Sequence, residues 1–233
     1  MRFFSPLFIY FVIGTCFGSF ANVLVYRLPR KKSIVSPPSF CPKCECPIRI
    51  YDLIPLVSYF ALKQRCRCCY AIIPARYPMI EFSCGLFFSA TAFIYTFPAV
   101  LAILMLSFAL FVITIVDFQV LEIPDSMVML IIFGAAFRIL VDPSSIHAAA
   151  ALIGAAAGAV PLYLFNKTTL LLIKKDGFGY GDMKLMGATG LFIGWQGVLI
   201  AFFFAFKTVS LDYVYLQQCN YIKAYFNHYS ATK

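Results

Sequence analysis

The apolar residues of the chain form long runs that are separated by short polar segments. A helix needs about 20 apolar residues to cross a bilayer. The runs predict about six transmembrane helices, over residues 3–28, two within 82–116 that turn near 96–98, 127–141, a fifth from about 147, and 185–206. The predicted fold class is therefore an all-α polytopic membrane protein.

Composition and charge support this interpretation. Of the 233 residues 62% are hydrophobic and 12% charged, which excludes a soluble domain of this size. The net charge of +9 suggests a nucleic-acid patch as an alternative, but ten of the nineteen Lys and Arg fall between Arg27 and Arg76, beside only Glu45 and Asp52. Basic residues crowded between two spans indicate a cytoplasmic loop, so we expect no nucleic-acid partner.

The basic loop also holds six of the nine cysteines. Cytoplasmic thiols rarely form disulfides, and two C-x-x-C pairs, Cys41 with Cys44 and Cys66 with Cys69, offer the four soft ligands that tetrahedral zinc requires. Cys46 and Cys68 leave the identity of one ligand in each pair open. Free thiols or a redox dithiol are the alternative to a zinc-binding loop.

These patterns divide the chain into four parts. We expect a first transmembrane helix over 1–28, a cytoplasmic cysteine-rich zinc-binding loop over 29–77, a membrane domain over 78–206 and a divergent polar tail over 207–233. The first helix lacks the basic start and the small-residue cleavage site of a signal peptide, so it is predicted to be permanent.

Two aspartates stand where apolar runs meet polar segments. Asp117 closes the run 101–116, and Asp182 ends the stretch Gly179-Tyr180-Gly181-Asp182. Counting spans places both at the cytoplasmic face, where two carboxylates sharing one proton can work as an aspartic protease dyad. The alternating glycines leave room for an extended peptide. A phosphate-binding loop is the competing interpretation, but the stretch lacks a G-K-[ST] ending.

Several other polar residues near the membrane faces receive structural interpretations. Gly18, Ser19 and Asn22 form a stripe that favours helix packing over substrate contact. Glu81 is expected to pair with Arg76 near the headgroups.

Two more charged residues lie at the ends of the fourth predicted span. Asp125 is interpreted as a helix cap or a substrate contact. Arg138 is expected to extend its side chain to the outer face of the membrane.

Taken in order, the motifs resemble those of the type IV prepilin peptidases of bacterial inner membranes. The matching segments are Gly18-Ser19-Phe20 with Asn22, Arg27-Leu28-Pro29, the two C-x-x-C pairs, Arg76-Tyr77-Pro78 with Glu81, Asp117 with Ile123-Pro124-Asp125, and Gly179-Tyr180-Gly181-Asp182 with Lys184-Leu185. The resemblance implies Asp117 and Asp182 as the catalytic pair and a zinc-binding loop. It also implies cleavage after the glycine that ends the basic leader of prepilins or pseudopilins, followed by N-methylation with S-adenosylmethionine.

The last part of the chain departs from that family. Relatives usually continue through about two more spans, whereas the sequence turns polar at Lys207, as expected of a truncated or frame-shifted gene. Two alternatives therefore stay open: an inactive relative that serves as a membrane scaffold, and a zinc-binding or redox membrane protein in which the aspartates are ion ligands.

Overall fold

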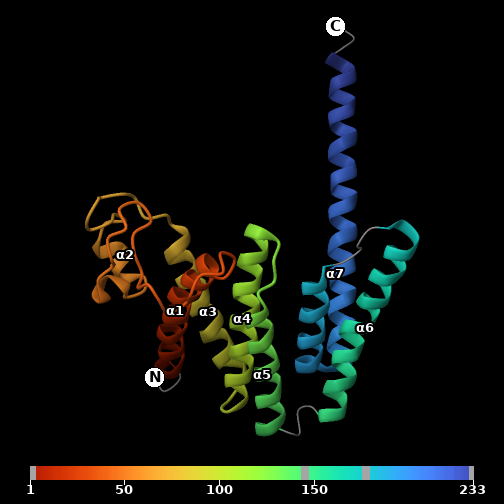
Figure 1. Ribbon diagram of the computed structural model, residues 1–233, viewed down its shortest axis with the longest axis horizontal. Helices are drawn as coiled ribbons and strands as arrows, with labels where there is room; N and C mark the ends of the chain where they lie inside the picture. The colour runs from red at the N-terminus through yellow and green to blue at the C-terminus, as the bar shows by residue number, and fades with distance from the viewer. Residues whose placement is uncertain (1–3, 143–146, 175–178, 231–233) are drawn as a thin grey trace.

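The structure, a computed structural model, describes residues 4–142, 147–174 and 179–230 and is built from helices (Figure 1). The described residues contain no strand, only two isolated bridges. The elements in chain order are α1 (Phe4–Arg27), the 3-10 turn η1 (Ile50–Leu53), α2 (Val57–Ala61), α3 (Arg76–Ile94), α4 (Ala99–Val120), α5 (Asp125–Val141), α6 (Ala148–Ile173) and α7 (Tyr180–Ser230). The predicted all-α fold is confirmed.

Five helices are long and apolar enough to cross a membrane, where the sequence predicts about six. They span Pro6–Arg27, Arg76–Ile94, Ala99–Val120, Ala148–Leu172 and Tyr180–Ala205 among the described residues. The helix outside this set is α5, whose 17 residues reach about 26 Å at 1.5 Å per residue, less than the roughly 30 Å of a hydrocarbon core. The turn predicted near 96–98 is present between α3 and α4.

The helix α7 is broken at Gly194, which adopts φ 74° and ψ 173°. Figure 1 shows the chain reversing direction there, so that a short first leg from Tyr180 precedes a longer second leg. The range predicted as one span, 185–206, falls almost wholly within the candidate span Tyr180–Ala205, but the break at Gly194 divides it into two legs. A uniformly apolar composition carries no sign of the break, because the backbone angles of one glycine set it.

The side chain of Arg138 lies at this break instead of extending to the outer face. Its Nη1 donates a hydrogen bond to the carbonyl of Phe192 at 2.9 Å, and its guanidinium lies 5.1 Å from the centre of the Phe192 ring. The last carbonyls of a helix have no partner within the helix. Arg138 supplies one at the end of the first leg.

Two helix pairs approach so closely that only glycine fits between them. A Cβ atom on Gly18 of α1 would lie 2.6 Å from the Cα of Glu81 in α3, as the packing interpretation of this residue requires. In the second pair, a Cβ on Gly154 of α6 would lie 2.3 Å from the carbonyl oxygen of Gly190 in α7, and one on Gly190 would lie 2.2 Å from that of Gly154. These contacts fix α3 on α1 and the first leg of α7 on α6.

Replacing Gly154 by valine is expected to lower the free energy of unfolding by about 1–3 kcal/mol or more, because backbone atoms of Gly190 and Gly194 leave no room for the side chain. Thermal unfolding of the purified protein in detergent measures the loss. The control is Ala156→Val, at an exposed position of the same helix. Equal melting temperatures for the two variants would contradict this account of the α6–α7 contact.

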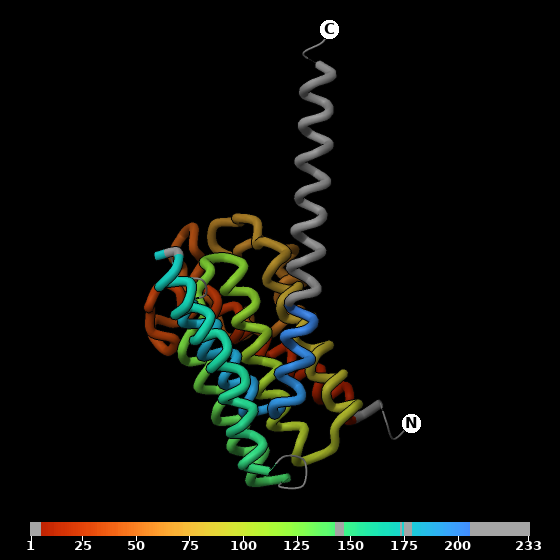
Figure 2. The backbone as a smooth tube through the Cα atoms, turned by 90° about the vertical axis from the view of Figure 1, so that its right-hand side faces the viewer, coloured from red at the N-terminus to blue at the C-terminus, as the bar shows by residue number. Residues whose placement is uncertain are grey.

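The helices place the sites at one end of the bundle. Buried side chains of α1, α3, α4, α5 and α7 form the core, including Leu24, Phe88, Val112, Ile131 and Phe192. Figure 2 shows the cysteine-rich loop, in orange, at one end, and the end of α5 and the start of α6 at the other. The C-terminal end of α4 and the start of α7 lie toward the same end as the loop (Figure 1).

Candidate functional sites

The cysteine-rich loop contains two turns of the same design. In the first, the Cys41 N–H donates to the Cys46 carbonyl at 2.9 Å and the Glu45 N–H to the Cys41 carbonyl at 2.8 Å. The second repeats these bonds from Cys66 to the Ala71 carbonyl at 2.8 Å and from Tyr70 to the Cys66 carbonyl at 3.0 Å. Each turn contains a C-x-x-C pair.

The two turns present four sulfur atoms to a common point. The Sγ atoms of Cys41, Cys44, Cys66 and Cys69 all lie within 4.8 Å of one another. Cys41 and Cys69 are 3.9 Å apart, and Cys44 and Cys66 are 4.0 Å apart. Zinc–sulfur bonds of about 2.3 Å in a tetrahedron place the sulfurs roughly 3.8 Å apart. The four thiols are therefore arranged so that they can hold a metal ion.

Position within the turns distinguishes the remaining two cysteines of the loop. Cys46 occupies the place that Ala71 has in the second turn, and Cys68 the place of Lys43 in the first. Neither belongs to the group of four sulfurs. Hydrogen bonds from the backbone of Cys69 and Cys68 lower the pKa of Cys66 to about 7, which favours the thiolate that a metal binds.

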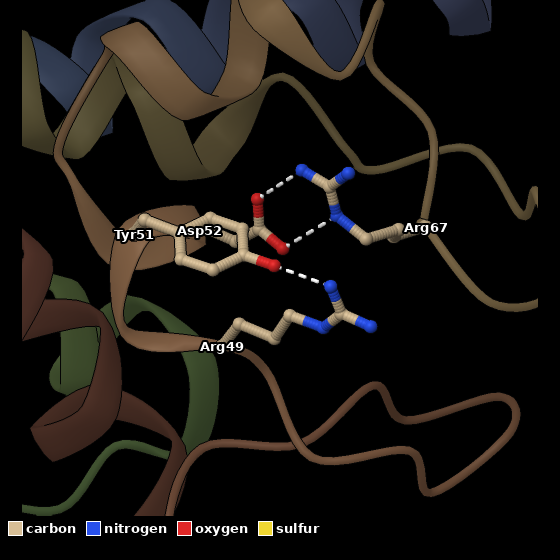
Figure 3. A network of polar contacts seen from close by, with 4 residues as sticks. All are labelled: Arg49, Tyr51, Asp52 and Arg67. Carbon is tan, nitrogen blue, oxygen red and sulfur yellow. Dashed lines mark hydrogen bonds and ion pairs between the residues drawn. The ribbon is translucent and has the colours of Figure 1, made fainter.

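An ion pair joins the two halves of the loop (Figure 3). Asp52, whose side chain is 8% exposed, accepts hydrogen bonds from Arg67 Nη2 at 2.7 Å and Arg67 Nε at 2.9 Å. These bonds hold the pKa of the Asp52 carboxyl below its usual value. Arg49 donates to the Tyr51 hydroxyl beside them. The network ties the segment between the two turns to the second turn.

The two candidate catalytic aspartates lie at helix ends, Asp117 at a C-terminal end and Asp182 at an N-terminal end. Asp117 lies in the last turn of α4, where its carbonyl accepts the N–H of Leu121 at 2.9 Å, and Asp182 lies in the first turn of α7, where its N–H donates to the Gly179 carbonyl at 3.2 Å. Both residues are exposed. No hydrogen bond joins the two carboxylates within the described part of the chain, so each is open to a third molecule.

Contacts join the α4–α5 connection and the first residue of α5 to the start of α7. A Cβ on Gly181 would lie 3.1 Å from the Cβ of Ile123, so a larger residue would press on the connection. Lys184 Nζ lies 2.9 Å from Asp125 Oδ1. Pro124 occupies the N-cap position of α5 and no side chain caps the helix, so Asp125 is not its cap. Asp125 is instead paired with Lys184.

Gly179 stands next to the carboxylate of Asp182. A Cβ there would lie 3.3 Å from Asp182 Oδ2, tighter than an ordinary contact. The glycine therefore keeps one face of the carboxylate uncovered, which a peptide backbone needs to approach it.

Glu81 does not form the ion pair with Arg76 that the sequence suggests. Its Oε2 accepts the backbone N–H of Leu56 at 2.8 Å, and its side chain also hydrogen-bonds with Ser19. Arg76 instead lies 5.1 Å from the centre of the Tyr77 ring. Leu56 has φ 61°, and no sequence signal marks this backbone contact between the loop and α3.

A cavity of about 360 Å³ lies between the cysteine-rich loop and the adjoining ends of α1 and α3. Motif residues that belong to neither the sulfur cluster nor the aspartate pair line it, namely Ser19, Asn22, Arg27, Tyr77, Pro78 and Glu81. Asn22 Nδ2 bridges α1 and α3 by donating to the Tyr77 carbonyl at 3.2 Å. A smaller cleft of about 80 Å³ shares Asn22 and Tyr77 with the cavity and reaches Gln119.

Comparison with known proteins finds two families along the chain. The bacterial peptidase A24 N-terminal domain matches residues 12–95, and the type IV leader peptidase family matches residues 103–211. The chain is 34% identical to the prepilin leader peptidase/N-methyltransferase of Klebsiella pneumoniae over 81% of its own length and 85% of the relative's. It is also 34% identical to the protein of that name from Neisseria gonorrhoeae, over 82% and 76% of the two lengths. No solved structure matches.

Proposed function

The chain belongs to the type IV leader peptidase family, and from this membership we propose that it is an aspartic endopeptidase of the bacterial inner membrane. Its proposed substrates are type IV prepilins or pseudopilins, whose short basic leader it removes after a glycine. The observation that supports the proposal is that exposed Asp117 at the end of α4 and exposed Asp182 at the start of α7 both lie toward the end of the bundle that holds the basic loop.

The proposed reaction is general acid–base hydrolysis by the two carboxyl groups. One of Asp117 and Asp182 is ionised and takes a proton from a water molecule, whose oxygen bonds to the scissile carbonyl carbon. The other is protonated and donates its proton as the carbon–nitrogen bond breaks, so that the products are a carboxyl end on the leader and a free amine on the pilin. Gly179 leaves the approach to Asp182 open, and Gly181 gives the start of α7 room against Ile123.

The cysteine-rich loop is proposed to hold a structural zinc ion through Cys41, Cys44, Cys66 and Cys69. All four ligand positions are then filled by protein, which is the arrangement of a structural site and leaves no open position for catalysis. The ion would tie the two turns together and so shape the loop above α1 and α3.

The second proposed activity is methylation of the amine that cleavage exposes, with S-adenosylmethionine as methyl donor. The support is the name of the relatives, which couples leader peptidase with N-methyltransferase. The described residues contain no helix preceded by a Rossmann-type glycine fingerprint. A binding site for S-adenosylmethionine would therefore be formed by other residues.

Co-expression of the chain with a prepilin tests both activities. Leader removal is expected as a faster-migrating product, and mass spectrometry of that product is expected to find the mass of one added methyl group. Uncleaved precursor beside a stably inserted chain, with a relative active on the same precursor, would overturn the peptidase and favour an inactive membrane scaffold. Cleaved but unmethylated product would overturn only the methyltransferase.

A further inference from the structure

We propose that the cavity between the cysteine-rich loop and the ends of α1 and α3 binds S-adenosylmethionine. This inference rests on the proposed methyltransferase activity and assigns it a site. The cavity volume of about 360 Å³ falls in the range of small-molecule sites and is too small for a substrate helix. Its walls come from α1, α3 and both turns of the loop, so the fold of the loop determines whether the cavity exists.

The lining offers a partner for each part of the donor. The sulfonium and the amino group are positive and require a carboxylate, which Glu81 supplies. The adenine ring requires a flat apolar surface, which Tyr59 and Tyr77 offer. The donor's own carboxylate is matched by the guanidinium group of Arg49, which also lines the cavity and whose partner, the Tyr51 hydroxyl, is neutral.

Glu81 is held in place for this role. The Leu56 N–H at 2.8 Å and the Ser19 side chain fix the carboxylate, and Gly18 packs against the Cα of the same residue. Placing a carboxylate at the first turns of a membrane helix is costly, and its contacts here are two neutral groups and no cation. A cationic ligand would supply the missing opposite charge.

The basic leader of a prepilin is the competing occupant, and the charge of the region disfavours it. Ten Lys and Arg residues lie between Arg27 and Arg76, and only Asp52 and Glu81 bring carboxylates to the cavity. Asp52 is already paired with Arg67. A chain of lysines would meet net positive charge, whereas the donor needs only one carboxylate for its cationic part.

The position of the cavity suits a product handed over from the peptidase site. The smaller cleft shares Asn22, Tyr26 and Tyr77 with the cavity and extends to Gln119. Gln119 lies two residues after Asp117 in α4, a rise of about 3 Å along the helix. The cleft therefore extends from the cavity toward the turn of α4 that carries Asp117.

Methyl transfer in the cavity needs no further reactant. The neutral pilin amine forms a bond to the methyl carbon, and the sulfur–methyl bond breaks with its electron pair remaining on sulfur. The products are S-adenosylhomocysteine and an N-methylammonium group, which releases one proton to solvent. The role of Glu81 is to position the positive end of the donor.

Ultraviolet crosslinking of radiolabelled S-adenosylmethionine to the purified full-length protein, followed by peptide mapping, locates the donor. Label is expected within residues 39–81, and label within 117–125 or 179–190 would overturn the proposal. Equilibrium dialysis of the same donor is expected to give Glu81→Gln an affinity at least tenfold lower than that of the wild type. The methylated fraction of the cleaved pilin should fall in parallel.

Matched variants distinguish a loss of donor contacts from a loss of the loop fold. Glu45→Gln removes a carboxylate of the same loop that does not line the cavity, and it is expected to bind the donor as the wild type does. Ser58→Phe fills the cavity from α2 and should reduce binding while the loop keeps its metal. Wild-type affinity in both Glu81→Gln and Ser58→Phe would overturn the site. Wild-type protein that cleaves but neither binds nor transfers methyl would overturn the methyltransferase itself.

Discussion

Replacing Asp117 by asparagine is expected to reduce leader removal by about 100-fold or more, and replacing Asp182 to do the same. An amide cannot take a proton from water, and it cannot donate one to the leaving amine. Since the two groups act as a unit, the double variant should be hardly slower than either single one. The rate of conversion of a purified prepilin, followed by the mobility shift of the product, measures all three.

The matched control for both substitutions is Glu122→Gln. Glu122 is an exposed acid of the α4–α5 connection, five residues from Asp117, and we expect its loss to change the rate less than twofold. The metal content of all variants should equal that of the wild type, because the cysteine-rich loop is a separate part of the chain. Undiminished cleavage by Asp182→Asn would exclude the proposed dyad.

Serine in place of Cys41, Cys44, Cys66 or Cys69 is expected to remove the bound metal and the order of the loop together. Structural zinc sites of small domains contribute roughly 10–16 kcal/mol of apparent binding free energy, and few other contacts hold this loop. The principal ones are the two turns, the Asp52–Arg67 pair, the Glu81–Leu56 bond and the bonds from Arg27 to the Ser33 and Pro37 carbonyls. Metal analysis should find about one zinc per wild-type chain. Limited proteolysis should cut the loop rapidly in the variants.

Cys46→Ser and Cys68→Ser provide controls within the same loop. Their sulfurs lie outside the group of four, so both variants are expected to keep the metal and resist proteolysis. Loss of metal in Cys46→Ser with retention in Cys44→Ser would mean that the first turn uses the other sulfur. A wild-type protein without metal and with all six loop thiols titratable would exclude the zinc site.

The sequence predicts well those features that depend on long apolar runs. The presence of two helices, α3 and α4, and the turn between them follow from the length of the run and from Pro98, and the common side of Asp117 and Asp182 follows from counting spans. Such features are recoverable because each span must satisfy its own backbone within the bilayer. The resemblance of the motifs to prepilin peptidases is likewise confirmed by the comparisons.

Features that depend on a single backbone or side-chain contact were not predictable. The Glu81 carboxylate accepts a hydrogen bond from the N–H of Leu56 and does not pair with Arg76. The Arg138 guanidinium donates to the carbonyl of Phe192 and does not extend to the membrane surface. In each case the partner is a backbone group, which every residue carries and no sequence pattern marks.

The shortness of α5 has a consequence for the surrounding lipid. Its 17 residues fall about 4 Å short of a typical hydrocarbon core, and Met129, Phe133 and Leu140 expose apolar surface along it. Acyl chains beside this helix have to compress to cover that surface without leaving the helix ends in hydrocarbon, at a cost of a fraction of a kcal/mol per Å. We therefore expect the bilayer to be thinner along this flank and the stability of the protein to depend on acyl-chain length there.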